Sequence, residues 1–214
     1  MVNCERKMYI LCLAFDFSPF TIDHSQKIKF MITALDKNTA LILIDLQKGI
    51  VTYPLAHPIE TILTNSAKLI AAFRKAGLPI VIVNVKPGGK WVQTRKDSQR
   101  PQTTPPADFY DITPEIKTEP TDIFITKQTW SAFHETALDE ELKKRNITGI
   151  VIGGVSTSIG VEGTARAASE RGYNIAFAQD AMTDMVIEAH ERSIKYIFPR
   201  MGEVDNTNAI IEKL

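Results

Sequence analysis

The chain has 214 residues, a size that suits one α/β domain with a full hydrophobic core. Hydrophobic residues make up 44% and charged residues 23%, which excludes a disordered, collagen-like or coiled-coil chain. The 25 basic residues balance the 25 acidic ones, so we expect no binding to nucleic acid or to an anionic membrane surface. The only two cysteines, Cys4 and Cys12, are too few for a disulfide framework or a tetrahedral zinc site, which favours a reduced, cytoplasmic protein.

Residues 1–35 are expected to form an N-terminal extension outside the core, ahead of a domain at 36–214. The apolar run at 8–15 resembles the centre of a secretory signal, but Asp16 interrupts it and no small-x-small cleavage site follows. The run is also too short to span a bilayer. Removing residues 1–30 should therefore leave folding intact.

From residue 39 onward, two kinds of segment alternate. Continuous apolar runs without polar alternation predict strands that are covered on both faces, at 40–44, 79–84, 122–125, 149–153 and 174–178. Amphipathic segments between and after them predict helices at 59–76, 136–145, 159–171, 189–198 and 207–214. Thr207 is a plausible N-cap of the last helix.

This alternation predicts an α/β fold with right-handed βαβ units and helices on both faces of a parallel sheet. In such sheets the ligand crevice lies beyond the carboxyl ends of the strands. The residues expected there are Asp45, Lys86, Lys127, the turn 156–160 and Asp180. The long connection 86–121 is expected to be a lid or a binding loop.

Several residues at this edge have both a chemical and a structural interpretation. Asp45 follows a buried strand and could act as a general acid or base with a raised pKa, or simply cap a turn. Lys127 could pair with Asp45 or bind an anionic substrate, although most lysines are merely solvated. Trp130 and Phe133 could wall an apolar pocket or pack over the strand ends.

The segment 153–166, GGVSTSIGVEGTAR, leads from a strand through a polar turn into a helix of small residues. Backbone N–H groups at such a helix start can bind an anion or form an oxyanion hole, or the glycines can simply permit close packing. The glycine spacing excludes a dinucleotide fingerprint. The histidines lie on separate segments and form no metal-binding motif.

Three motifs in this order resemble the isochorismatase-like hydrolases, also called the cysteine hydrolase superfamily. They are 43–47 (LIDLQ), 126–133 (TKQTWSAF) and 154–166. The resemblance implies a Rossmann-like three-layer αβα sandwich with a mainly parallel six-stranded sheet, and a homodimer or homotetramer. It also implies an Asp–Lys–Cys triad with Asp45 and Lys127 in the first two roles. A cis peptide bond is implied at Val155–Ser156, and oxyanion donors are implied at the amides of Ser156 and Gly160.

Gly160 stands where the family's nucleophilic cysteine would be, so thiolate chemistry is not expected. Isochorismatases proper also resemble this chain in having glycine there, and they need no nucleophilic side chain. We therefore expect Asp45 to be a general acid and Lys127 its electrostatic partner. The substrate would be a small anion such as isochorismate, cleaved by water to 2,3-dihydroxy-dihydrobenzoate and pyruvate.

The expected substrate-binding residues follow from the same motifs: Gln47, Lys86, Trp130, Phe133 and Ser156. Isochorismatases usually have tyrosine where Ser156 stands and glutamine where Lys86 stands, so the binding set is altered. Lys86 still suits a carboxylated substrate, and Arg95 or Arg100 could add a second contact. The metal ligands of the family's nicotinamidases include histidines after the second strand, and 86–121 contains none. We expect neither a metal nor another cofactor.

Two alternatives remain open. The chain could have lost catalysis and serve as a small-anion-binding or oligomeric interaction module, which would explain the missing nucleophile. It could also keep amidase chemistry, with Ser156 or Ser158 as the nucleophile or with water activated by Asp45, although the sequence offers no histidine base at a readable position.

Overall fold

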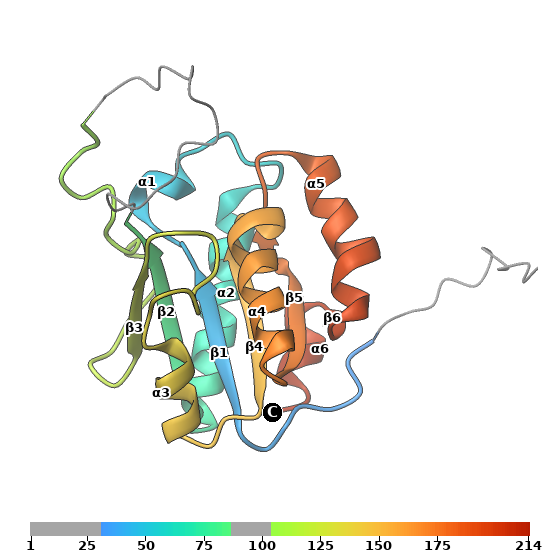
Figure 1. Cartoon of the computed structure of the whole chain (residues 1–214). Coiled ribbons are helices and arrows are strands. Elements are labelled where there is room, and N and C mark those ends of the chain that lie inside the picture. Colours follow the sequence, from blue (N-terminus) through green and yellow to red (C-terminus); the bar gives the residue numbers. More distant parts are fainter. Residues whose placement is uncertain (1–30, 87–103) are drawn as a thin grey trace, which may run out of the picture.

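A computed structural model describes residues 31–86 and 104–214 of the chain. Six parallel strands form a single sheet in the order β3-β2-β1-β4-β5-β6 (Figure 1). Their bounds are Thr39–Ile44 (β1), Ile80–Val85 (β2), Ile123–Lys127 (β3), Gly149–Val155 (β4), Asn174–Thr183 (β5) and Glu203–Asp205 (β6). The predicted α/β fold with a six-stranded sheet is confirmed.

Helices cover both faces of the sheet, as Figure 1 shows. The α-helices are α1 (Lys48–Val51), α2 (Ile59–Lys75), α3 (Leu138–Lys144), α4 (Glu162–Glu170), α5 (Ile187–Arg192) and α6 (Thr207–Ile211). Wider π-helical turns, Thr157–Val161 and Ser193–Ile197, precede α4 and follow α5, and a 3-10 turn spans Phe198–Arg200. The core cluster on one face includes residues of α2 and α6, and the cluster on the other face includes residues of α3 and α4.

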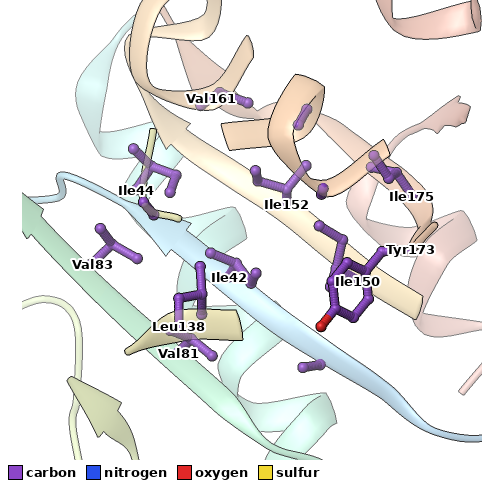
Figure 2. Packing of buried hydrophobic residues seen from close by; sticks show 14 of the residues in the cluster. Ile42, Ile44, Val81, Val83, Leu138, Ile150, Ile152, Val161, Tyr173 and Ile175 are labelled. Atoms are coloured by element: carbon purple, nitrogen blue, oxygen red, sulfur yellow. The ribbon is translucent and has the colours of Figure 1, made fainter. Parts of the chain in front are cut away.

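The central strands are buried on both faces, as their continuous apolar sequences predict. All six residues of β1 are buried, and successive side chains belong to opposite clusters. Ile42 and Ile44 pack with Ile150 and Ile152 of β4 on the face shown in Figure 2. This rigid centre fixes the point at which the chain leaves β1.

Some element boundaries differ from the sequence prediction. Strand β5 runs on to Thr183 instead of ending at residue 178, with a register shift in its pairing to β4. Two of the three residues of the short strand β6 are acidic, and this sequence did not suggest a strand. The N-cap of α6 is Asn206 rather than Thr207, because the Asn206 side chain accepts the N–H of Ala209.

Ile32, which falls in the segment expected to lie outside the core, packs in the core. Ile32 is 5% exposed and belongs to the core cluster that contains α2. Its N–H donates to Asp205 Oδ2 at 3.0 Å, and the Thr33 N–H donates to Glu203 Oε2 at 2.9 Å. The rest of the expected extension, residues 1–30, lies outside the described residues. In the described part of the chain, no helix has the length and apolar character needed to cross a membrane.

Candidate active site

Asp45 and Lys127 meet at the carboxyl edge of the sheet. Asp45 directly follows β1, and Lys127 is the last residue of β3. The Lys127 Nζ lies 2.6 Å from Asp45 Oδ2 and also donates to the Thr129 carbonyl at 3.1 Å. The two residues are only 4% and 2% exposed, so the ion pair is shielded from solvent. The structure thus brings together the two charged residues that the sequence singled out.

The surroundings of Asp45 raise the pKa of its carboxyl group. Burial raises its pKa from 3.8 to about 6, although the Lys127 cation and its hydrogen bond act in the opposite direction. Among the described residues, the buried Asp45 Oδ1 has no hydrogen-bond partner. The lone pairs of this oxygen are therefore not engaged by another group of the described residues.

The glycine-containing turn after β4 lies directly beside this carboxylate. The peptide bond Val155–Ser156 is cis, as the family resemblance implied. A Cβ atom placed on Gly160 would be 3.3 Å from Asp45 Oδ2 and 2.9 Å from Ile44 Cγ2. The backbone of Gly160 therefore lies beside the Asp45 carboxyl group, at the residue where the family resemblance implies a nucleophilic cysteine.

Gly154 allows β4 to come this close to β1. Its φ is +121°, and a Cβ atom there would overlap the carbonyl oxygen of Ile44. Since strands β1 and β4 are neighbours with Ile44 opposite Gly154, the turn begins beside Asp45.

Side chains from the segment after β5 hold this turn through hydrogen bonds. Asp184 Oδ2 accepts the Ser158 N–H and hydroxyl, both at 2.8 Å. Thr157 Oγ1 lies 2.8 Å from His190 Nδ1. Sequence reasoning missed Asp184 and His190. It placed Asp180 at the strand end instead, and that side chain caps α6 by accepting the Thr207 N–H and hydroxyl.

Gln47 is a positioning residue in this structure. It is 0% exposed, and its side chain accepts the Val85 N–H at 2.7 Å and donates to the Val85 and Tyr110 carbonyls. These contacts tie the exit of β1 to that of β2. Both N–H donors of the Gln47 amide are used by the protein, so a substrate could contact this side chain only through its Oε1.

The other predicted binding residues have different surroundings. Lys86 is exposed, its N–H donates to the Lys127 carbonyl, and its Nζ lies 5.8 Å from the centre of the Tyr110 ring. Trp130 is 56% exposed. Phe133, by contrast, is 5% exposed and packs against Tyr173, so the structure favours its packing interpretation. Ser156 is partly buried at the start of the turn.

The structure describes only part of the long connection 86–121. Arg95 and Arg100 lie outside the described residues. Residues 110–113 pair with the exit of β1, since Gln47 and Ile112 form an antiparallel bridge. Within residues 31–86 and 104–214, no group of three or more His, Cys, Asp or Glu side chains could hold a metal ion.

The family model for the isochorismatase domain matches residues 39–209. The chain belongs to the isochorismatase family. Over 190 residues it is 39% identical to the uncharacterized isochorismatase family protein YwoC of Bacillus subtilis, covering 83% of this chain and 95% of that protein. Over 182 residues it is 36% identical to YecD of Escherichia coli O157:H7, covering 83% and 97%.

Solved structures of the isochorismatase family agree with this assignment. An isochorismatase family protein from Burkholderia thailandensis superposes with a TM-score of 0.79 at 33% identity, over 85% of this chain and 97% of that chain. The chain is therefore a hydrolase with the isochorismatase-like fold.

Proposed function

We propose that this hydrolase cleaves a small anionic substrate by acid catalysis from Asp45, with water as the nucleophile and without a covalent intermediate. The observation that carries the proposal is the Asp45 environment: a buried carboxyl with a pKa raised to about 6 and a free Oδ1, beside Gly160. A carboxyl of this kind can donate a proton near neutral pH. No thiol at residue 160 competes for the role of first attacking group.

Isochorismate is the substrate that we propose to test first. Asp45 donates its proton to the methylene carbon of the enol ether, and the π electrons form the new C–H bond. Positive charge then develops across the ether carbon and oxygen. Water adds to that carbon and returns a proton to the Asp45 carboxylate. Collapse of the hemiketal breaks its bond to the ether oxygen, the hydroxyl proton passes to that leaving oxygen, and pyruvate and 2,3-dihydroxy-dihydrobenzoate are released.

Lys127 serves this cycle as an electrostatic partner. Its cation stabilises the Asp45 carboxylate that proton donation leaves behind, at an Nζ–Oδ2 distance of 2.6 Å. Lys86 supplies an exposed cation next to the strand that carries Lys127, and we propose that it attracts the substrate carboxylate. Ser156 and the exposed Trp130 would contact the rest of the molecule. Assembly into a homodimer or homotetramer and a cytoplasmic location stay predictions.

The test is the Asp45→Asn variant, assayed by pyruvate release from isochorismate. We expect turnover to fall by about 10²- to 10⁴-fold, the usual contribution of a positioned acid. Asp139→Asn, which changes a carboxylate on α3, is the matched control and should keep the wild-type rate. Wild-type turnover by Asp45→Asn would overturn the acid role.

A module that binds small anions without turnover is the second candidate, favoured by glycine at residue 160. A thermal-shift screen of isochorismate and small carboxylated amides, followed by product analysis for each ligand, separates the two functions. Stabilisation without product for every ligand would favour the binding module.

A further inference from the structure

Asp184 is a buried carboxylate directly behind the turn that carries Gly160. It is 2% exposed and follows the last residue of β5. Oδ2 accepts the Ser158 N–H and hydroxyl, while Oδ1 accepts the N–H groups of Met185 and Val186. Its side chain therefore joins the turn to the segment that enters α5.

This carboxylate also changes the charge at the start of a helix. The π-helical turn Thr157–Val161 continues directly into α4, so Ser158 lies in the first turn of a helical segment that ends at Glu170. Free N–H groups there would give the site a partial positive charge. Asp184 accepts the hydrogen bond of the Ser158 N–H and carries a negative charge. Because this carboxylate is buried, solvent screens its charge only weakly.

Hydrogen bonds from Ser158, Met185 and Val186 stabilise the Asp184 carboxylate. In the part of the chain that the structure describes, Asp184 forms no ion pair. His190 is neutral at neutral pH because burial lowers its pKa to about 4, although the Asp184 charge acts in the opposite direction. The His57 ring packs on it with centroids 4.6 Å apart. Glu162, the other buried carboxylate behind the turn, is paired with Arg166.

We propose that Asp184 is a positioning residue that fixes the turn and keeps it electronegative, so that the site favours positive charge developing on the substrate over negative charge. This inference rests on the proposed function, in which protonation by Asp45 creates an oxocarbenium-like centre. A thiolate or an oxyanion at the same place would be disfavoured. Asp184 would thus suit the turn to chemistry that needs no nucleophilic side chain.

Turnover of isochorismate provides the first test of this inference. In the otherwise unchanged enzyme, Asp184→Asn should lower kcat on isochorismate by about tenfold, while KM stays the same or falls because an anionic substrate is no longer repelled. Asp184→Glu retains the charge and should recover part of kcat. A merely structural role would lower kcat and raise KM together, which would overturn the proposal.

A thiol reporter tests the same electrostatic effect without any substrate. Gly160→Cys, combined with Cys4→Ser and Cys12→Ser, places one thiol beside Asp45, and the pH dependence of its alkylation by iodoacetamide gives its pKa. Adding Asp184→Asn should lower this pKa by about 1, since a negative charge is removed. An unchanged or raised thiol pKa would contradict the inference.

The two measurements keep this inference separate from the proposed function. Absence of isochorismate turnover in the wild type would count against the proposed function, whereas the thiol pKa would still decide the effect of Asp184. If circular dichroism shows that Asp184→Asn does not fold, Ser158→Ala in the thiol background replaces it. That change removes one donor from the carboxylate and should raise the thiol pKa; a lowered or unchanged value would overturn the inference.

Discussion

The protonation state of Asp45 sets the pH range in which an acid mechanism can operate. Because the pKa of Asp45 is raised to about 6, the proton-donating form dominates below pH 6. We expect kcat/KM to be constant there and to fall about tenfold per pH unit above it. A full pH profile of isochorismate hydrolysis measures this.

The Lys127→Met variant provides the check on that profile. Since the Lys127 cation lowers the pKa of Asp45, its removal should move the decline in rate to higher pH. A profile that instead rises with pH in the wild type would mean that Asp45 acts as a base.

His190 should control stability over the neighbouring pH range. Burial lowers its pKa from 6.5 to about 4, so between these values the unfolded chain binds a proton that the folded chain does not. This contribution to the free energy of unfolding is present above pH 6.5 and is lost on acidification, by about 3 kcal/mol in total. Asp45 acts with the opposite sign, because its folded-state pKa lies above 3.8 and the folded chain binds its proton first.

A variant separates these two contributions. Urea unfolding should be measured for the wild type and for His190→Asn at pH 7 and at pH 4.5. On acidification the wild type should lose about 2–3 kcal/mol more of its free energy of unfolding than the variant does. His134→Asn, which makes the same substitution at an exposed histidine, is the control. Parallel curves for wild type and His190→Asn would contradict the assignment.

The site residues that could be identified from the sequence are those at the carboxyl end of a strand, because that position determines where they lie in the fold. Asp45 and Lys127 come at the ends of apolar runs, so they had to emerge at the carboxyl edge of the sheet. Asp184 was missed because β5 continues through the polar residues Gln179 and Asp180, which hide its true end. The interior role of Gln47 was equally hidden, because its partners are backbone groups from distant segments.

Among the structural elements, the segment 108–113 makes one especially close approach to α1. The Phe109 ring lies against Gly49, so a Cβ atom on Gly49 would overlap the ring. The Gly49 N–H also donates to the Phe109 carbonyl at 3.1 Å. Gly49→Ala should therefore lower the free energy of unfolding by about 1–3 kcal/mol, measured by urea titration.

A double-mutant cycle supplies the control for this clash. In a Phe109→Ala background the ring is gone, so Gly49→Ala should cost much less than it does in the wild type. Equal costs in both backgrounds would show that the ring does not cause the effect.

Elements with strong packing requirements were the predictable ones. Both-face burial of β1 and β4 demands the continuous apolar sequences from which they were recognised. Strand β6 has only three residues, of which two are acidic, and it forms because β5 offers a free edge. Its existence depends on a tertiary partner that no local pattern reveals.

At the scale of the whole molecule, strand order explains why the site lies where it does. The chain builds outward from β1 to β3 and then returns to start β4 on the other side of β1. The carboxyl ends of β1 and β4 therefore flank the point where the order reverses, which is where open α/β sheets bind ligands. The strand-end rule placed the three motifs at this edge of the sheet, and the family resemblance assigned the roles of Asp45 and Lys127.

The start of the domain yields the last prediction. Ile32 is 5% exposed in the core, whereas its neighbour Met31 is 47% exposed. Ile32→Ala should lower the free energy of unfolding by about 2–4 kcal/mol, because it removes buried methyl groups and leaves a cavity. Met31→Ala, the control, should change it by less than about 0.5 kcal/mol. Deleting residues 1–30 should likewise leave urea unfolding unchanged. A large loss of stability on that deletion would show that the segment before Ile32 contributes to the core, and the domain would then have to be extended toward the N-terminus.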